Sequence, residues 1–159
     1  MTYRALVITV STRTAAGIWT DTSGPILVSA LSALGIEVAG PVVVADGDPV
    51  GAALRSGIDS GFDLIVTTGG TGLSPTDHTP EQSAQFLDRQ IPGIAESIRA
   101  KGLAAGVPTA ALSRGLAGLA GQTLIINVPG SAGGARDAAV ALEPVILHAL
   151  DQIRGGQHD

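Results

Sequence analysis

The run from Thr67 to Gly72, which reads Thr-Thr-Gly-Gly-Thr-Gly, has the residue types best suited to binding a ligand. Its glycines can adopt positive φ angles and bring the backbone close to a ligand, so its N–H groups can surround phosphate oxygens. A tight turn uses the same glycines, and the glycines alone favour neither interpretation. Because threonine hydroxyls and Asp77 stand beside them, we favour a binding loop. Its candidate contacts are Thr68, Gly69, Gly70, Thr71 and Gly72.

Asp46 and Asp77 are candidate ligands of a metal ion at such a phosphate site. Carboxylates near phosphate groups commonly bind Mg²⁺, whose remaining ligands are waters and phosphate oxygens. The ion would neutralise charge and orient a phosphoryl or nucleotidyl group. Capping a helix or ordering a loop is the competing role, and spacing alone favours that simpler role for either aspartate taken singly. Asp48 precedes Pro49 and is assigned to a helix cap.

Arg13 and Arg114 are candidate cationic contacts of a phosphate group, because a guanidinium offers paired N–H donors to its oxygens. A surface ion pair is the commoner role of an arginine and remains the alternative. His78 suggests a general base, but we expect a solvent-facing loop residue. Trp19 either covers a ligand or packs between subunits, and His148 is expected on a helix surface.

The composition excludes several classes of function. The formal net charge is −5, and no basic stripe is present to replace the counterions of a nucleic acid. With no cysteine, the chain has no disulfide, thiolate catalyst or zinc–thiolate site. No signal peptide or membrane-spanning stretch is visible, so we expect a cytoplasmic protein without a membrane partner. Because bulk charge does not attract a phosphate ester, backbone N–H groups, a few arginines and a metal must bind it.

The elements that position these residues alternate between strand-like and helix-like segments. Short apolar, β-branched runs predict strands over 5–10, 37–45, 62–67 and 123–128. Helical spacing of apolar residues predicts helices over 23–34, 48–60, 79 onward, 93–100 and 135–153. Pro41 indicates an edge position or a bulge in the second strand, and Pro144 must kink or split the last helix. The segment 104–119 has no clear pattern.

Three helix starts carry a capping residue next to a proline. Ser23 is the predicted N-cap of the first helix, and Asp48 that of the second. Thr79 to Gln82 matches a capping box, with Pro80 at the first helical position. The alternation of strands and helices predicts a largely parallel sheet with helices on both faces. Ligands bind beyond the carboxyl ends of such strands, which is where the polar loops lie.

In combination these residues resemble the MogA/MoaB-like molybdopterin-binding family. The glycine run, followed by Asp77, Thr79 and Pro80, resembles the signature loop of that family. The other matching segments are Ser11-Thr-Arg13, Gly17, Asp21, Ser23-Gly-Pro25, Leu112-Ser113-Arg114 and Asn127-Val-Pro-Gly-Ser131. The match covers essentially the whole chain, and the combination is specific although each piece alone is not. We expect one domain over residues 1–154 and a frayed tail over 155–159.

The resemblance implies a three-layer α/β/α sandwich with a mostly parallel sheet, usually in a homotrimer. It implies that ATP and Mg²⁺ adenylylate molybdopterin in molybdenum cofactor biosynthesis, giving adenylyl-molybdopterin, which passes to the molybdenum insertase, and pyrophosphate. The two acidic positions of the family fall on Asp46 and Asp77, as catalytic residues and metal ligands. The implied substrate and nucleotide contacts are the glycine run with Ser11, Arg13, Asp21, Ser23, Ser113, Arg114, Asn127, Pro129, Gly130 and Ser131.

Some positions depart from the pattern of the family. Ala45 and Gly47 flank Asp46 where the family often has Pro-Asp-Asp, and Thr76 stands where an arginine often precedes the second aspartate. Ala132 to Gly134 replace a proline and an occasional lysine. The missing basic residues favour the alternative function, a non-catalytic molybdopterin-binding carrier of the MoaB type. ATP consumption in the presence of molybdopterin distinguishes the two.

Overall fold

A six-stranded sheet forms the centre of the computed structural model, which describes residues 2–156. The strand order is β2-β1-β3-β6-β5-β4. The strands are β1 (Arg4–Val10), β2 (Glu37–Val44), β3 (Leu64–Thr68), β4 (Arg89–Gln90), β5 (Ala117–Ala120) and β6 (Thr123–Val128). The first three and β6 run parallel, whereas β5 is antiparallel to both β6 and β4. Of the tail predicted to fray, residues 157–159 lie outside the described part.

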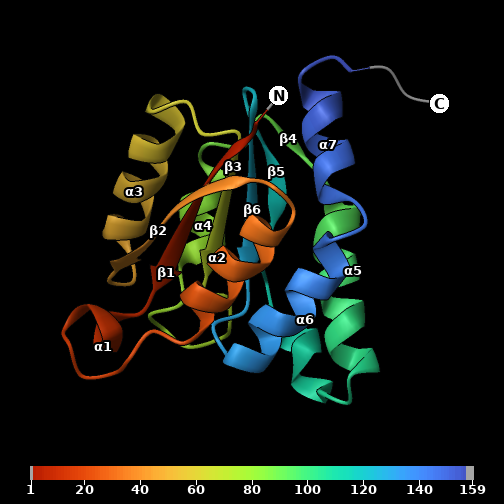
Figure 1. The fold of residues 1–159 in the computed structure, drawn as a ribbon. Helices are drawn as coiled ribbons and strands as arrows, with labels where there is room; N and C mark the ends of the chain where they lie inside the picture. The colour runs from red at the N-terminus through yellow and green to blue at the C-terminus, as the bar shows by residue number, and fades with distance from the viewer. Residues whose placement is uncertain (1, 157–159) are drawn as a thin grey trace.

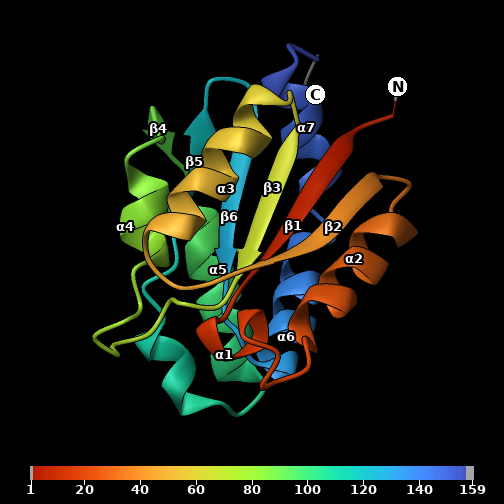
Figure 2. The same ribbon diagram turned by 90° about the vertical axis from the view of Figure 1, so that its left-hand side faces the viewer.

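Helices cover both faces of this sheet (Figures 1 and 2). One face carries α3 (Asp48–Asp59) and α4 (Thr79–Ala84), and the other carries α2 (Ser23–Ala33), α5 (Pro92–Ala104), α6 (Ala132–Leu142) and α7 (Ile146–Ile153). The short α1 (Thr12–Ala15) and the 3₁₀ turn η1 (Pro108–Leu112) lie outside these layers. The three-layer fold with a mostly parallel sheet is therefore confirmed.

Two apolar cores form because successive strand residues point to opposite faces of the sheet. In β1, Ala5 and Val7 enter the larger core under α2, α5, α6 and α7, while Leu6 and Ile8 enter the smaller one under α3. Leu64 and Val66 of β3 face the larger core in the same way. Strands buried on both faces explain the continuous apolar runs in the sequence.

The second strand lies at the edge of the sheet, as Pro41 predicts. The Gly40–Pro41 peptide bond is cis, and the register between β1 and β2 shifts between Leu6 and Ile8. The split at Pro144 is also confirmed, since α6 ends at Leu142 and α7 begins at Ile146. No helix in the described residues is long and apolar enough to cross a membrane.

The predicted helix caps are wrong. The carboxylate of Asp21, rather than the Ser23 hydroxyl, accepts a hydrogen bond from the N–H of Gly24 at 3.0 Å. Gly47 precedes α3, so Asp48 lies within the first turn. Thr79 likewise lies inside α4 and caps no N–H group, because the helix begins one residue earlier than a capping box requires. In each case the path of the chain into the helix determines which side chain reaches the first N–H groups of that helix.

Candidate functional site

A hollow of about 680 Å³ lies at the carboxyl ends of β1 and β3, where the connections of the sheet diverge. From β1 the sheet continues to β2 on one side, and from β3 it continues to β6 on the other side. The point between two such strands is the usual ligand position in open α/β sheets. Thr9 pairs with Thr68 at this edge. We call this cavity the polar hollow; its lining residues are 9–14, 19–23, Asp46, 68–70, Thr76, Asp77, Gly130 and Ser131.

The glycine loop forms one wall of the polar hollow. Gly69 and Gly70 have φ angles of +106° and +68°, which glycine adopts without strain. A Cβ on Gly69 would overlap the carbonyl oxygen of Val10, so no other residue fits there. The N–H groups of Gly70, Thr71 and Gly72 donate to no acceptor among the described residues. The loop therefore offers the unpaired N–H groups that a phosphate nest requires.

Three further predicted residues fix the shape of this wall. The hydroxyl of Thr68 donates to the carbonyl of Pro129 at 2.8 Å and joins the loop to the turn after β6. Gly130 lies directly against Gly69, since a Cβ on it would be 3.0 Å from the Gly69 Cα. Ser131 caps α6 by accepting from the N–H of Gly134 at 2.9 Å. The amino end of α6 consequently opens at the glycine loop.

Asp46 follows the end of β2 and lies beside the glycine loop, since a Cβ on Gly70 would stand 3.2 Å from its Oδ1. Its Oδ2 accepts hydrogen bonds from the hydroxyl of Thr12 at 2.8 Å and from the Thr12 N–H at 3.3 Å. Its own N–H donates back to the Thr12 hydroxyl at 3.1 Å. Its Oδ1 accepts no hydrogen bond from the described residues. Thr12, which the sequence analysis did not single out, therefore fixes one oxygen of the carboxylate and leaves the other available.

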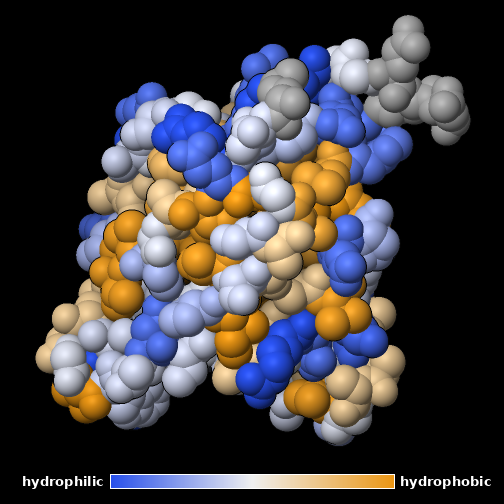
Figure 3. All heavy atoms as spheres, viewed as in Figure 1, coloured by the Kyte–Doolittle hydropathy of each residue, from blue (hydrophilic) through white to orange (hydrophobic). Residues whose placement is uncertain are grey.

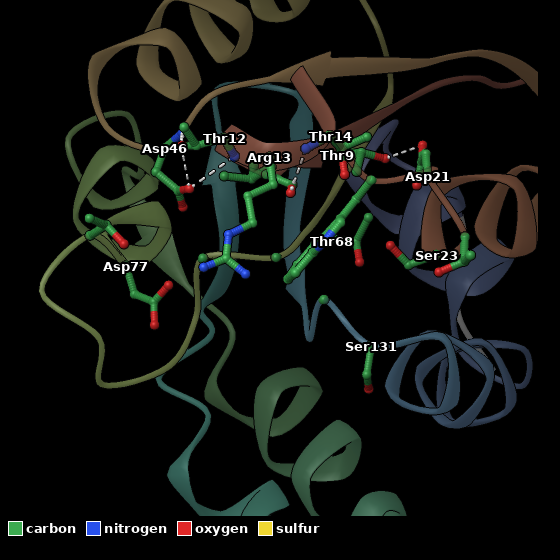
Figure 4. Close-up of a pocket in the computed structure, with 18 of the residues that line it drawn as sticks. Thr9, Thr12, Arg13, Thr14, Asp21, Ser23, Asp46, Thr68, Asp77 and Ser131 are labelled. Carbon is green, nitrogen blue, oxygen red and sulfur yellow. Dashed lines mark hydrogen bonds between the residues drawn. The ribbon is translucent and has the colours of Figure 1, made fainter. Parts of the chain in front are cut away.

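Asp77 enters the same hollow from the loop before α4. Its Oδ2 accepts from the N–H of Ser74 at 3.0 Å, while Oδ1 has no donor among the described residues. Figure 4 shows Asp46 and Asp77 on one side of the hollow and Asp21 and Ser23 on the other. No group of three or more acidic or histidine side chains in residues 2–156 is arranged to hold a metal. Any ion here would be bound by one or two carboxylates.

The residues that follow β1 also line the polar hollow. Ser11 caps α1, accepting from the N–H of Thr14 at 3.2 Å. Arg13 places its guanidinium over the Trp19 ring, 4.6 Å from the centroid. The Asp21 carboxylate accepts from the Thr9 hydroxyl at 2.8 Å and from the Gly24 N–H at 3.0 Å, so both of its oxygens are hydrogen-bonded within the protein. Arg13 is the only arginine or lysine among the described residues that line this hollow.

A second cavity of about 380 Å³ lies on the other side of the glycine loop and shares Ser131 with the first. We call it the apolar hollow. It contains the predicted residues Thr71, Gly72, Ser113 and Pro129. Its apolar walls come from α5 and η1, at Ile98, Val107, Ala110 and Leu112. The loop thus separates a polar compartment from an apolar one.

Arg114 lies in neither hollow. Its guanidinium donates to the carbonyls of Gly72 at 2.9 Å and Asp77 at 2.8 Å, and it forms an ion pair with Glu81 at 2.7 Å. The hydrogen bond from Arg114 lowers the pKa of the Glu81 carboxyl. Arg114 therefore joins the two ends of the loop that carries Asp77, and makes the ion pair that was its alternative role.

Asn127 is also outside both hollows, with its amide buried between β3, β6 and α4. Its Oδ1 accepts from the N–H of Leu116 at 3.0 Å. Its Nδ2 donates to the hydroxyls of Thr67 and Ser83, both at 2.9 Å. Asn127 thereby connects the strand that leads into the glycine loop with the helix that follows Asp77. A polar residue inside an apolar strand was the sequence signal for this network.

Comparison with known proteins identifies the family of the chain. A family model described as a probable molybdopterin binding domain matches residues 6–148. The chain is 36% identical over 157 residues to a molybdenum cofactor biosynthesis bifunctional protein of Chlorobaculum tepidum, covering 98% of this chain and 50% of that protein. It therefore spans about half the length of that relative.

Two further relatives are of similar length to this chain. The molybdopterin adenylyltransferase of Helicobacter pylori (strain 26695) is 36% identical over 153 residues, covering 94% of this chain and 86% of that protein. The structure of the molybdopterin biosynthesis Mog protein from Mycobacterium ulcerans superposes with a TM-score of 0.88 at 52% identity, covering 95% of this chain and 99% of that one. The fold is thus shared along nearly the whole chain.

Proposed function

This chain belongs to the molybdopterin-binding domain family, and on that premise we propose that it adenylylates molybdopterin in molybdenum cofactor biosynthesis. The observation that carries the proposal is the glycine loop, whose Gly69 and Gly70 line the same hollow as Asp46 and Asp77, with the N–H of Gly70 unpaired among the described residues. Relatives named molybdopterin adenylyltransferase, of which this chain covers most of the length, support the reaction. ATP is the proposed co-substrate.

The phosphate groups of both substrates fit the polar hollow. N–H groups of the glycine loop and the amino end of α6, capped by Ser131, supply donors and partial positive charge. Arg13, which also lines this hollow, supplies a full positive charge. The apolar hollow, which meets the polar one at Ser131, offers the apolar walls that a flat heterocycle needs. A molybdopterin molecule can therefore place its ring in the apolar hollow and its phosphate in the polar hollow, with the glycine loop between them.

Asp46 and Asp77 fit Mg²⁺ because each presents one carboxylate oxygen without a donor among the described residues. Mg²⁺ is usually bound by one or two carboxylates, with waters and substrate phosphates completing the shell. Such an ion supplies charge neutralisation between phosphate groups. Thr12 holds the carboxylate of Asp46 through its hydroxyl and N–H, and the Ser74 N–H holds that of Asp77.

In the proposed reaction a terminal phosphate oxygen of molybdopterin forms a bond to the α-phosphorus of ATP. The bond from that phosphorus to the oxygen it shares with the β-phosphorus breaks, and pyrophosphate leaves. The chain contributes orientation and charge stabilisation rather than a covalent intermediate. The rigid attachments of the loop, through Thr68 to Pro129 and through Arg114 to Gly72, keep its N–H groups in place.

One observation favours the alternative of a molybdopterin carrier without catalysis. Thr76, rather than a basic residue, lines the polar hollow beside Asp77, which leaves Arg13 as its only cationic side chain within the described residues. A carrier would bind molybdopterin and leave ATP unchanged.

Incubation of the purified protein with molybdopterin, ATP and Mg²⁺ tests the proposal. We expect adenylyl-molybdopterin and pyrophosphate in equal amounts, with turnover reduced at least about 100-fold in Asp77→Asn while molybdopterin still binds. Asp59→Asn, at the exposed end of α3, is the matched control and should keep full activity. Molybdopterin binding without any product from the unmodified protein would refute catalysis and favour the carrier.

Further proposals concern the context of the domain. We propose a single domain over residues 1–154 that forms a homotrimer and works in the cytoplasm. Figure 3 shows apolar side chains exposed on the face that carries α2 and α7. Val140 of α6 and Val145, which precedes α7, are 53% and 41% exposed. The relative named a bifunctional protein is about twice as long as the segment that matches this chain, which supports transfer of the product to a partner. We propose the molybdenum insertase as that partner. Sedimentation equilibrium tests the trimer directly.

A further inference from the structure

Thr79 carries the only buried side-chain nitrogen or oxygen in residues 2–156 that has no hydrogen-bond partner. The residue is fully buried at the start of α4. Its backbone is well satisfied, since its N–H donates to the Gly70 carbonyl at 3.1 Å and its own carbonyl accepts from the Ser83 hydroxyl at 2.8 Å. Buried hydroxyl groups are nearly always paired, so the unpaired Oγ1 requires a physical explanation.

The position of Gly70 shows what this hydroxyl faces. A Cβ on Gly70 would overlap the Oγ1 of Thr79 and would stand 3.2 Å from the Oδ1 of Asp46. The hydroxyl and the carboxylate oxygen thus approach the same point from α4 and from the end of β2. Because Gly70 has no side chain, nothing from that residue separates them.

Asp46 is correspondingly held on one side only. Thr12 donates twice to Oδ2, whereas Oδ1, the oxygen next to Gly70, has no donor among the described residues. A carboxylate fixed through one oxygen can still turn about its last bond. A donor on the second oxygen would fix its plane, and a hydrogen bond to a charged oxygen is stronger than one between neutral groups.

We propose that Thr79 is a positioning residue for Asp46: its hydroxyl donates to one lone pair of Asp46 Oδ1 in the substrate complex, which leaves the other lone pair for a metal ion, and fixes the carboxylate from the side opposite Thr12. This inference rests on the proposed function, in which Asp46 acts at the phosphate groups. It assigns Gly70 a second task besides its positive φ, because the lack of a Cβ lets the two side chains meet.

The test compares Thr79→Val, which keeps the shape and removes the hydroxyl, with Thr79→Ser, which keeps the hydroxyl. In the adenylylation assay we expect Thr79→Val to lower kcat by about 10- to 100-fold, as for loss of one hydrogen bond to a charged group, with the KM for ATP changed less than about 3-fold. Thr79→Ser should retain kcat within about 3-fold. The melting temperature of Thr79→Val should be unchanged or higher, because the variant removes an unpaired buried hydroxyl.

Thr123→Val is the matched control. Thr123 is another buried threonine, but its hydroxyl is paired, donating to the Phe62 carbonyl at 2.7 Å at the opposite end of the sheet. It should lose melting temperature and keep kcat, the reverse of Thr79→Val. A Thr79→Val enzyme with the kcat of the unmodified protein, or one whose kcat falls only in proportion to its folded fraction, would overturn the inference.

A crystal structure of the unmodified protein with Mg²⁺ and a non-hydrolysable ATP analogue gives an answer that does not depend on any variant folding. We expect Thr79 Oγ1 within about 3 Å of Asp46 Oδ1, and a hydroxyl bonded to a different group would overturn the inference. An unmodified protein that makes no adenylyl-molybdopterin refutes the proposed function instead. The crystal structure still decides the contact in that case.

Discussion

Replacing Asn127 by leucine separates two roles that the sequence could not distinguish, a contact to substrate and a structural connection. The leucine side chain has the same number of heavy atoms and the same branching as that of asparagine, but it cannot form hydrogen bonds. The change therefore removes the partner of the Leu116 N–H and of the Thr67 and Ser83 hydroxyls. All of these contacts are 2.9 or 3.0 Å long.

The expected cost follows from those contacts. Each lost hydrogen bond reduces the free energy of unfolding by about 1 kcal/mol, and a buried group left unpaired costs about 1–3 kcal/mol. The two hydroxyls lose a donor but can still donate, as Ser83 does to the Thr79 carbonyl, whereas the Leu116 N–H loses its acceptor. We therefore expect Asn127→Leu to lower the free energy of unfolding by about 3 kcal/mol, which multiplies the unfolding equilibrium constant by roughly 100.

Urea unfolding measures this loss as a lower midpoint at an unchanged slope. Gln122→Leu is a suitable control, because Gln122 is exposed just before β6 and its replacement should change stability by less than about 0.5 kcal/mol. Activity per folded molecule of Asn127→Leu should fall as well, since Ser83 lies in the helix that follows Asp77. An Asn127→Leu protein with full stability but weakened molybdopterin binding would refute this reasoning and make Asn127 a substrate contact.

Two further predictions concern the glycine loop and the start of α4. Arg114 lowers the pKa of Glu81 in the folded protein, so the stability that Glu81 contributes is present above its unfolded pKa and is lost as pH falls. The difference in free energy of unfolding between the unmodified protein and Glu81→Gln, measured by urea titration, should therefore shrink between about pH 5 and pH 3. Gly69→Ala should lower the free energy of unfolding by more than about 2 kcal/mol, because its Cβ overlaps the Val10 carbonyl, whereas Gly47→Ala, also at positive φ but with open space around it, should cost only about 1–2 kcal/mol. Equal melting temperatures for these two alanine variants would contradict the close approach of Gly69 to β1.

The sequence by itself determined the elements and the end of the sheet at which the site lies. Apolar runs such as 5–10 and 123–128 form strands because their pattern is local, and a loop that follows a parallel strand must lie at its carboxyl end. For that reason Ser11, Asp46, Gly69 and Ser131 could be assigned to one region from their order alone, and they line one hollow. The short β4 and β5 escaped prediction, since strands of two and four residues carry too little pattern.

Only the tertiary structure decided how individual polar side chains are used. The resemblance implies that Arg114 and Asn127 contact substrate, and in the structure they bond Glu81 and Ser83, which come from segments about 30 to 45 residues away. Thr79 looked like a helix cap, and its hydroxyl instead faces Gly70. A side chain bonds the donor or acceptor that packing brings nearest, and packing depends on the whole chain rather than on neighbouring residues. Residue type and spacing therefore locate the site, and contacts between distant segments assign the roles within it.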